Sequence, residues 1–387
     1  MKTTSLDLFV FADALGWEQV RKREFMTDLF PCRSRCETLL GYSCTCDPSI
    51  LTGCLPSEHG HFSFFVDGRE ERPFRSLGLL GSIPETLAAQ HRVRNVVSRR
   101  VAQAKGYTGY FQLYSVPFSK LPWLDYTEKR DIYEPGGILG GQPTIFQHWK
   151  DSGIPWVRSD WRQNDENNVA HLKSEIEKGG VRLAYLFTAG LDAAMHAHGT
   201  TGAKVDEAFA RFEKWLREIQ ELAGRNYETV RWHLFSDHGM TDTVQVSGMM
   251  PEFEELKLEY GRDYTAVWDS TMLRLWFKGG AAVRREVASW LLVHGEGRIL
   301  SEQMLRDNGC YFPDGRYGEM IYLLNNGVIF APSYMNQRRV PGMHGFDPAE
   351  ADSAACWLTS EPCADPPRRI EQIFQVMHRA MKNLQRT

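Results

Sequence analysis

Three short apolar segments, each ending at or beside an acidic residue, constrain the fold of this 387-residue chain more than any other feature. They are LDLFVFAD (6–13), RLAYLFTAGLD (182–192) and RWHLFSDHG (231–239). Their hydrophobicity is nearly continuous, which is typical of strands buried on both faces in a helix-covered, largely parallel sheet. In such sheets the functional crevice lies beyond the carboxyl ends of the strands, where Asp13, Asp192 and Asp237 would project.

A second pattern predicts the helices and an insertion. KVDEAFARFEKWLREIQELAG (204–224) has apolar residues at helical spacing, so it predicts an amphipathic crossover helix that ends at Gly224. Within residues 262–335 lie the strand-like STMLRLWF (270–277), the helix-like AAVRREVASWLLVHG (281–295) and the strand-like EMIYLLNNGVIFA (319–331). That order predicts a small β-α-β insertion that leans over the crevice.

The length suits one large α/β domain with an insertion, or two domains. We expect a core formed by 1–249 and 336–387, with a central, largely parallel sheet and helices on both faces. Residues 250–335 would form the insertion. Part of 95–165, a segment rich in aromatic residues, glycine and proline, would complete the cap.

Charge and hydropathy argue against two classes of partner. The net charge of −4 gives no electrostatic footprint for nucleic acid or for an anionic membrane. No apolar run reaches the roughly 18 residues that a membrane span requires. Asp7 and Asp13 lie within and just after the apolar start of the chain, which favours a buried first strand over a secretory signal peptide.

The cysteines predict a reducing environment. Eight cysteines are too few for a disulfide scaffold, and those between Cys32 and Cys54 lack the spacing of a structural zinc site. We expect reduced, mostly buried thiols and a cytoplasmic protein. The sequence does not define an oligomeric state.

Side chains of metal-ligand type gather at the predicted strand ends and in nearby loops. Asp192 and His196 stand four apart in GLDAAMHAHG, Asp237 and His238 are adjacent in FSDHGM, His344 lies in PGMHGFDP, and Asp13 closes the first strand. These six ligands are too many for one open zinc site but suit two ions of three ligands each. Two ions about 4 Å apart can hold the attacking and the leaving oxygen of an in-line displacement at phosphorus.

Each of these residues also has an ordinary structural explanation. An aspartate at a strand end commonly caps a helix, and an isolated histidine is commonly a hydrogen-bonded core or surface residue. The run from Ser43 to Cys46, just ahead of a predicted helix, suits a tight turn or cap as well as an anion site. It is the complete ordered set that points to a metal centre.

In that order the motifs resemble the alkaline phosphatase superfamily, and within it the nucleotide pyrophosphatase/type I phosphodiesterase branch. Asp192, His196 and Gly199 match the branch's Asp-x-x-x-His-x-x-Gly pattern, which selects His196 over His198. SDHGM is specific to the branch, and PSILTGCLPSEHG is similar to its segment after the nucleophile. The motifs extend from residue 13 to residue 347, so the resemblance covers the whole core.

The resemblance implies an alkaline-phosphatase-like core with a nucleophile and two metal ions. Ser43 stands ten positions before Gly53, which is the place of the nucleophilic hydroxyl in the family. One ion would be held by Asp192, His196 and His344, and the other by Asp13, Asp237 and His238, with Ser43 Oγ reaching it. Three imidazoles favour Zn²⁺, and Mn²⁺ is the alternative.

Two departures from the family pattern bear on function. Thr45 and Asp47 occupy positions that are Pro and Arg in sulfatases, which argues against a formylglycine sulfatase. Cys46 occupies the position of an Asn that contacts a phosphate oxygen in many relatives, so another donor would have to replace it.

We therefore expect a metal-dependent hydrolase of phosphate esters that works through a covalent phospho-Ser43 intermediate. The alternatives are a phosphomonoesterase or a phosphotransferase or mutase at the same site. An alternative of another class is an inactive metal-binding or regulatory protein. The expected partner is a small phosphate ester or a nucleotide-like molecule.

The surroundings of Ser43 favour a phosphodiester or pyrophosphate over a monoester. No arginine lies beside Ser43, and Asp47, Glu58 and Asp242 lack the partners that a third metal would need. Nothing in the sequence thus adds the positive charge that a dianionic monoester requires.

Aromatic residues of 105–162 could stack a nucleobase, although packing within a cap is the commoner role. Arg158, Arg162 and Arg274 could bind a second anionic group, although ion pairs are the commoner role.

Overall fold

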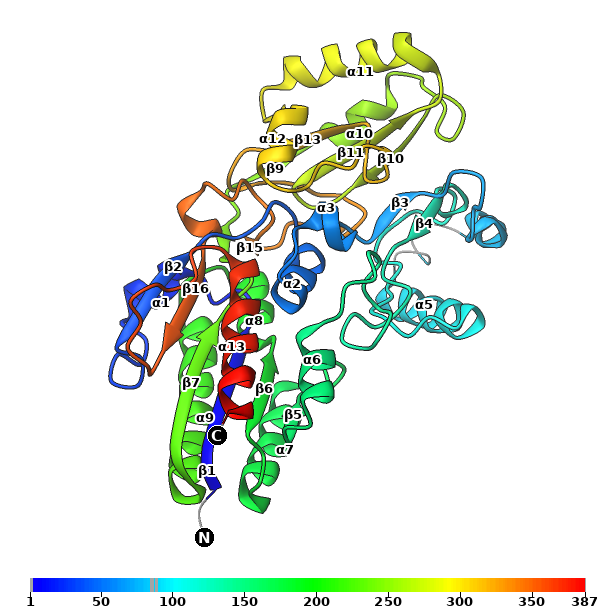
Figure 1. Cartoon of the computed structure of the whole chain (residues 1–387). Coiled ribbons are helices and arrows are strands. Elements are labelled where there is room, and N and C mark those ends of the chain that lie inside the picture. The colour runs from blue at the N-terminus through cyan, green and yellow to red at the C-terminus, as the bar shows by residue number, and fades with distance from the viewer. Residues whose placement is uncertain (1–2, 84–86, 88–89, 387) are drawn as a thin grey trace.

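The computed structural model describes residues 3–83, 87 and 90–386 of the chain (Figure 1). The main sheet has six strands in the order β2-β16-β7-β1-β6-β5. They are β1 (Thr3–Ala12), β2 (Cys32–Cys36), β5 (Trp156–Arg158), β6 (Leu183–Thr188), β7 (Tyr227–Phe235) and β16 (Ala355–Thr359). β1 pairs in parallel with β6 and β7, β5 pairs in parallel with β6, and β16 runs antiparallel to β7 and β2. The predicted α/β class with a largely parallel central sheet is confirmed.

Both faces of this sheet are buried, which explains why its strands are almost continuously apolar. Along β1, Leu6, Leu8 and Val10 face one hydrophobic core, whereas Phe9 and Phe11 face the other. The first core includes residues of α7 (Asp165–Lys178), α8 (Gly190–His198) and α9 (Ala203–Asn226), and the second includes residues of α2 (Ser43–Thr52), α6 (Ile145–Ser152) and α13 (Ile373–Gln385). Helices therefore cover both faces.

The sequence predicts that the crossover helix α9 ends at Gly224, and this prediction is wrong. It continues to Asn226, and Tyr227 directly begins β7. A glycine inside a helix costs roughly 1 kcal/mol relative to alanine. The buried apolar face of α9, which includes Val205, Phe212 and Leu216, outweighs that cost.

A second sheet has four antiparallel strands in the order β10-β11-β13-β12 and lies at the top of Figure 1. Its strands are β10 (Tyr264–Trp268), β11 (Met272–Phe277), β12 (Gly297–Ile299) and β13 (Met320–Leu324), and α11 (Gly280–His294) connects β11 to β12. The sequence patterns predict β11 and α11 but miss β10 and β12. We retain the division into a core (1–249 and 336–387) and an insertion (250–335) as a proposal.

The predicted strand 319–331 is wrong as a single element. It divides into β13 and β14 (Val328–Phe330), because the chain turns at Gly327, whose φ of 77° is a left-handed conformation. β14 then pairs in parallel with β9 (Gln245–Ser247) instead of extending the second sheet.

The remaining elements join these parts. The helices are α1 (Trp17–Arg23), α3 (Pro56–His59), α5 (His91–Lys105), α10 (Met249–Glu254) and α12 (Glu302–Asp307), with 3-10 turns at Arg75–Ser82, Leu121–Trp123, Ala351–Ser353 and Ile370–Gln372. β3 (Phe65–Asp67) pairs with β4 (Leu124–Tyr126), and β8 (Thr241–Asp242) pairs with β15 (Gly342–Met343).

The segment 95–165, which the sequence assigns in part to a cap, divides between the two sheets. Val101, Leu113 and Tyr126 belong to the hydrophobic cluster of the second sheet. Further along, α6 covers one face of the main sheet and β5 forms its edge.

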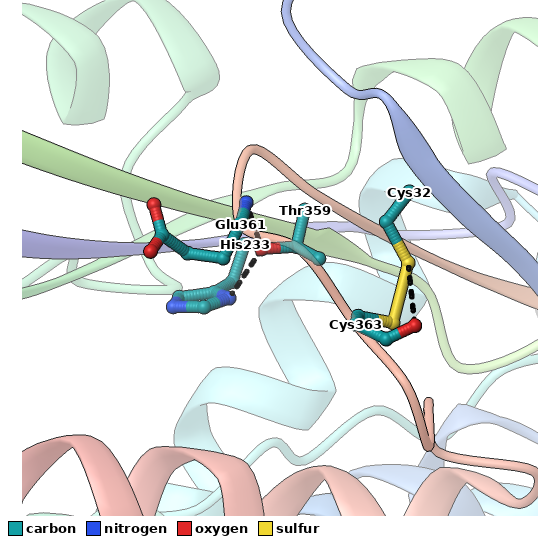
Figure 2. The surroundings of a disulfide bond; sticks show 5 residues. All are labelled: Cys32, His233, Thr359, Glu361 and Cys363. Carbon is teal, nitrogen blue, oxygen red and sulfur yellow. Dashed lines mark hydrogen bonds between the residues drawn. A yellow bond between two sulfur atoms is a disulfide. The ribbon is translucent and has the colours of Figure 1, made fainter.

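A disulfide joins Cys32, at the start of β2, to Cys363, in the loop after β16 (Figure 2). The expectation that all cysteines are reduced is therefore wrong for this pair, whose members are 331 positions apart in the sequence. The other cysteines are free, namely Cys36, Cys44, Cys46, Cys54, Cys310 and Cys356. Within the described part of the chain, no helix is both long and apolar enough to cross a membrane.

This pairing predicts the thiol count of the purified protein. Alkylation under denaturing conditions without a reductant should label the six free cysteines, and prior reduction should add two more, Cys32 and Cys363. Intact-mass and peptide mass spectrometry measure both numbers. Labelling of all eight cysteines without a reductant would contradict the disulfide.

Candidate active site

The ends of two neighbouring strands bring the first set of ligand-type side chains together. Asp13 directly follows β1, and Asp237 and His238 follow β7, which pairs with β1 in parallel. Potential ligand atoms of these three residues lie within 4.8 Å of one another. The backbone N–H of Ala14 donates to Asp237 Oδ1 at 3.2 Å, which links the two strand ends. We call Asp13, Asp237 and His238 the strand-end group.

A helix supplies most of the second set. Asp192 was expected at a strand end, but β6 ends at Thr188 and Asp192 lies in the first turn of α8. His196 follows one turn later on the same helix face, and the loop containing His344 completes the set. Potential ligand atoms of Asp192, His196 and His344 also lie within 4.8 Å of one another. We call these three residues the helix group.

Two aspartates hold α8 at its ends. Asp165 accepts hydrogen bonds from the backbone N–H groups of Ala189 and Gly190, at 3.0 and 2.9 Å, and so caps the start of the helix. Asp242 accepts from the backbone and the hydroxyl of Thr200, just beyond its end. Both contacts join residues more than twenty positions apart, so no local sequence pattern indicates them.

The two groups adjoin each other through their histidines. The rings of His238 and His344 stack with centroids 3.7 Å apart and an interplanar angle of 14°. The ring of His196 lies 5.1 Å from that of His344. All six predicted ligands therefore share one crevice.

Backbone carbonyls orient two of the three imidazoles. Nδ1 of His196 lies 2.8 Å from the carbonyl oxygen of Gly342, and Nδ1 of His238 lies 2.9 Å from that of Gly239. A carbonyl can only accept, so each Nδ1 carries the proton and each Nε2 remains available to a metal. Carbonyl partners of this kind are typical of metal-binding histidines.

Several buried atoms of these residues lack the hydrogen bonds that burial requires. Asp13 Oδ1 and His344 Nδ1 have no hydrogen-bond partner within the described residues. Asp192 Oδ1 and Asp237 Oδ2 lie 3.2 and 2.9 Å from Nε2 of His196 and His238, and they are without a donor wherever those Nε2 atoms carry no proton. Buried polar atoms are nearly always satisfied, and leaving one without a partner costs about 1–3 kcal/mol. The orphaned atoms of both groups therefore fit a pair of bound divalent cations.

The pKa values of the site residues also indicate an excess of negative charge in the crevice. Burial, together with the charges of Asp237 and Asp192, raises the pKa of Asp13 well above its ordinary value. Burial is the largest cause and would lower the pKa of His238, but the charge of Asp237, its hydrogen bond to the ring and the charge of Asp192 together outweigh burial and raise the pKa. Burial and the neighbouring His238 and His196 lower the pKa of His344 well below its ordinary value, so this ring is neutral.

Ser43 is the first residue of α2, and its Oγ lies 3.1 Å from Nε2 of His238 in the strand-end group. The expectation that the run from Ser43 to Cys46 precedes the helix is therefore wrong: these residues form the first turn of α2, and Pro48 lies inside the helix. The first N–H groups of a helix and its dipole favour negative charge, so the hydroxyl stands where an anionic phosphate would be stabilised.

The residues after Ser43 turn away from the crevice. Cys44 Sγ and Thr45 Oγ1 both donate to the carbonyl of Phe62, and Cys46 is buried beside Thr38. Burial is the largest cause that raises the pKa of Cys44 and Cys46 well above the ordinary value, which disfavours their thiolates. Of this run, Ser43 alone contacts one of the predicted ligands, so the four residues combine a nucleophile position with a packed turn.

Asp47 lies one turn after Ser43 on α2 and adds to the acidic surroundings. Its Oδ1 is buried without a hydrogen-bond partner in the part of the chain that the structure describes. Burial and the charge of Asp237 raise its pKa well above the ordinary value. Glu58, by contrast, binds the backbone N–H of Leu55 at 2.8 Å.

The basic residues singled out in the sequence all have carboxylate partners. Arg274 is fully buried and lies 2.7 Å from Asp269, and Arg162 lies 2.9 Å from Asp131. Arg158 pairs with Glu134. These arginines form ion pairs within the protein, which was the commoner of the two expected roles.

The aromatic residues of 105–162 mostly pack against one another. The ring of Phe111 lies 4.7 Å from that of Tyr126, and Tyr110 contacts Phe64 and Trp161. Tyr110 is nevertheless 37% exposed. Burial is the largest cause that raises its pKa.

Comparison with known proteins supplies the family. A profile of the family described as type I phosphodiesterase/nucleotide pyrophosphatase matches residues 37–347. Human ectonucleotide pyrophosphatase/phosphodiesterase 5 superimposes with a TM-score of 0.68 at 14% identity, over 99% of this chain and 95% of that chain. The murine protein gives a TM-score of 0.67 at 14% identity with the same coverage, and it is also known in complex with AMP.

A third solved structure is that of a bacterial hydrolase. Phosphonoacetate hydrolase from Sinorhizobium meliloti 1021, in complex with phosphonoacetate, gives a TM-score of 0.63 at 11% identity, over 98% of this chain and 96% of that chain. No curated protein sequence matches this chain.

At such low identity the solved structures establish the fold, whereas the profile establishes the family. Its match begins ahead of Ser43 and extends beyond His344. Members of the family use divalent metal ions. This chain belongs to the type I phosphodiesterase/nucleotide pyrophosphatase family and is a hydrolase that acts on phosphoric ester bonds.

Proposed function

We propose that this enzyme cleaves phosphodiester or pyrophosphate bonds through a covalent phospho-Ser43 intermediate. The observation that carries the proposal is the position of Ser43 Oγ, at the start of α2 and 3.1 Å from His238 of the strand-end group. A nucleophilic hydroxyl needs both an activating charge and a place where the developing negative charge is stabilised, and this position supports both.

Two metal ions complete the proposed site. The helix group would hold one ion, and the strand-end group, with Ser43, would hold the other. When bound, the pair would supply Lewis-acid charge for the nucleophile, the phosphoryl oxygens and the leaving oxygen. Three imidazoles, two of which have Nδ1 beside a backbone carbonyl, favour Zn²⁺, and Mn²⁺ is the alternative.

The proposed reaction has two displacements. Ser43 Oγ attacks phosphorus, a P–Oγ bond forms, and the bond to the alkoxide or phosphate leaving group breaks. The hydroxyl proton of Ser43 is passed to the leaving group. Water then attacks phosphorus, breaks the P–Oγ bond and restores the hydroxyl, so the net reaction consumes one water.

The charge of the crevice supports diesters over monoesters. Asp47 stands one turn from Ser43, and neither its ionised nor its neutral form adds the positive charge that a dianionic monoester needs. Arg158, Arg162 and Arg274 are already paired. Tyr110, with its partly exposed ring, offers a flat wall for a base or other apolar substituent.

The molecules bound in two solved relatives are both small. The murine relative is known with AMP, and the bacterial one with phosphonoacetate. We propose a small phosphate ester or nucleotide-like substrate. A phosphomonoesterase, or a phosphotransferase in which an alcohol replaces water, remains the alternative at the same site.

The cellular location stays a prediction. The sequence favours the cytoplasm, whereas a disulfide such as Cys32–Cys363 is typical of proteins in oxidising compartments.

Replacement of the nucleophile tests the proposed intermediate. Ser43→Ala should lower kcat/KM by about a thousandfold or more, because the displacement loses its attacking oxygen. Metal content and melting temperature should stay close to those of the wild type. Ser57→Ala, which removes an exposed helical hydroxyl, is the matched control. Full activity of Ser43→Ala would redirect the nucleophile to Cys44 or Thr45.

A comparison of three substrates tests the substrate class. We expect higher kcat/KM on bis-p-nitrophenyl phosphate or on a nucleotide 5′-p-nitrophenyl ester than on p-nitrophenyl phosphate, because the crevice lacks extra positive charge. A preference for the monoester of more than about tenfold, roughly 1.4 kcal/mol of transition-state stabilisation, would reverse the assignment.

Metal removal links the site to pH. The raised pKa values of Asp13 and Asp47 mean that these carboxyls stabilise the metal-free fold at low pH and that this contribution is lost as pH rises through their folded pKa values. The raised pKa values of His196 and His238 mean that protons compete with metal at low pH.

The rise in melting temperature on adding Zn²⁺ to chelator-treated protein should therefore be larger at about pH 8 than at about pH 5.5. Differential scanning fluorimetry measures both values. A double variant, Asp192→Asn with Asp237→Asn, should show little rise at either pH. An equal rise at both pH values in the wild type would contradict this account.

A further inference from the structure

The residue ahead of the nucleophile contacts the second sheet. The phenol oxygen of Tyr42 accepts a hydrogen bond from the backbone N–H of Thr271 at 3.1 Å and lies 2.8 Å from Thr271 Oγ1. Thr271 is fully buried in the turn between β10 and β11. Tyr42 is thus fixed by an element far from it in the sequence.

The direction of the hydroxyl hydrogen bonds follows from their chemistry. Thr271 Oγ1 lies 2.6 Å from the carbonyl oxygen of Gly345, which can only accept, so Thr271 donates its one proton there. Tyr42 must then donate to Thr271 Oγ1. The result is a continuous series of hydrogen bonds from Tyr42, the residue before Ser43, through Thr271 to Gly345, the residue after His344.

Tyr42 also packs directly against the loop that carries His344. Its ring lies edge-on to the His344 ring, with centroids 5.8 Å apart. A Cβ on Gly345, where φ is 87°, would come within 2.4 Å of the Tyr42 ring. Close approach of Tyr42 therefore requires glycine at this position.

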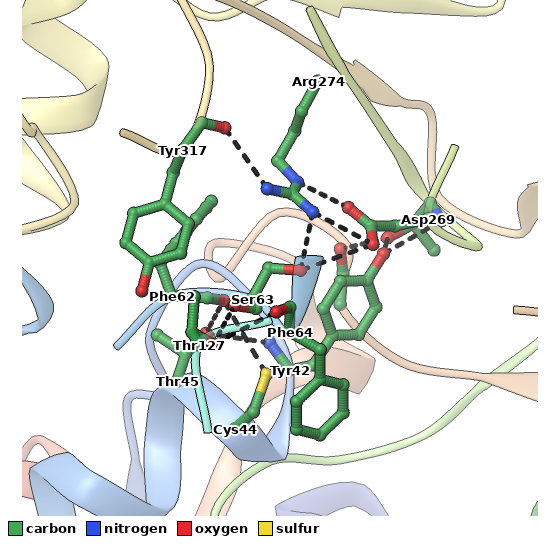
Figure 3. Close-up of polar contacts among 12 residues, drawn as sticks. Tyr42, Cys44, Thr45, Phe62, Ser63, Phe64, Thr127, Asp269, Arg274 and Tyr317 are labelled. Atoms are coloured by element: carbon green, nitrogen blue, oxygen red, sulfur yellow. Dashed lines mark hydrogen bonds and ion pairs between the residues drawn. The ribbon is translucent and has the colours of Figure 1, made fainter. Parts of the chain in front are cut away.

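The turn that carries Thr271 is itself held rigidly (Figure 3). Asp269 and Arg274 form an ion pair of 2.7 Å that is almost completely buried, and Arg274 also donates to Ser63 Oγ at 2.8 Å. Ser63 follows Phe62, whose carbonyl accepts from Thr45 on α2. A second route thus joins the same turn to the nucleophile helix.

We propose that Tyr42 and Thr271 are positioning residues, through which the second sheet sets the places of Ser43 and His344 for the reaction. The inference rests on the proposed function of Ser43. Errors of about 1 Å in reacting groups cost about a hundredfold in rate, so a rigid link from both sides of the crevice has a direct kinetic consequence.

Removal of single hydroxyls tests the proposal. Tyr42→Phe and Thr271→Val should each lower kcat on bis-p-nitrophenyl phosphate by about tenfold or more, with KM within about twofold. Zn²⁺ affinity, measured by competition with a chelator, should fall by about tenfold because His344 is less well held. The kcat of the double variant should fall about as far as that of either single variant, since both substitutions interrupt the same series of hydrogen bonds. Thr271→Ser keeps the hydroxyl and should retain activity even if Tyr42→Phe folds poorly.

Tyr317→Phe is the matched control. It removes another buried tyrosine hydroxyl that joins the second sheet to the core, through a 2.6 Å bond to the carbonyl of Gly60, but it touches neither Ser43 nor His344. It should lower the melting temperature without changing kcat.

Three outcomes would overturn the inference. One is a kcat within about twofold of wild type in Tyr42→Phe and Thr271→Val. Another is an equal loss of kcat in Tyr317→Phe, which would show a general structural effect. The third is unchanged Zn²⁺ affinity in Tyr42→Phe and Thr271→Val, which would show that these hydroxyls do not position His344. Ser43→Ala in the same assay distinguishes a failure of this inference from a failure of the proposed function. Full activity of Ser43→Ala would reject Ser43 as the nucleophile, whatever the hydroxyl variants show.

Discussion

Three carboxylates in one buried crevice are the constraint on which the rest of this structure depends. Asp13 has a buried oxygen without a hydrogen-bond partner among the described residues, and buried oxygens of Asp192 and Asp237 lie 3.2 and 2.9 Å from Nε2 of His196 and His238. Like charges in a low-dielectric site repel strongly, and burial together with the charges of Asp237 and Asp192 raises the pKa of Asp13. Protonation of His196 and His238, whose pKa values are raised, relieves part of this repulsion, whereas the neutral imidazole of His344 and the hydroxyl of Ser43 add no charge. Two divalent cations would neutralise these carboxylates without those protons, and the same cations would stabilise the phosphoryl group during its transfer.

The fold brings these groups together by two different routes. Parallel pairing of β1 and β7 places Asp13 beside Asp237 and His238, as it places the ends of any two such strands. The helix group instead depends on α8, which is held at its start by Asp165 and beyond its end by Asp242. The second sheet adds a third anchor through Thr271. Three separate parts of the chain thus determine the position of one crevice.

Much of this could be predicted from the sequence, because the strands and the ligands carry local signals. The buried strands and the amphipathic helix are visible as periodic patterns, and the ordered motifs from Asp13 to His344 are specific to the family. The end of α9 beyond Gly224, the division of 319–331 and the Cys32–Cys363 disulfide were missed. The extension of α9 depends on packing of its apolar face, and the disulfide joins segments 331 positions apart, so neither has a local signal. The turn at Gly327 is local, but the pairing of β14 with the distant β9 is not. The link from Tyr42 to Thr271 has no sequence signal for the same reason.

The central claim is that the two groups hold two ions side by side, with the nucleophile next to one of them. Anomalous diffraction from crystals of the Zn²⁺-loaded enzyme, collected at the zinc absorption edge, tests it most directly. The account predicts two peaks, one about 2.0–2.2 Å from ligand atoms of Asp192, His196 and His344 and the other at similar distances from Asp13, Asp237 and His238. A single peak, or peaks only outside this crevice, would contradict it.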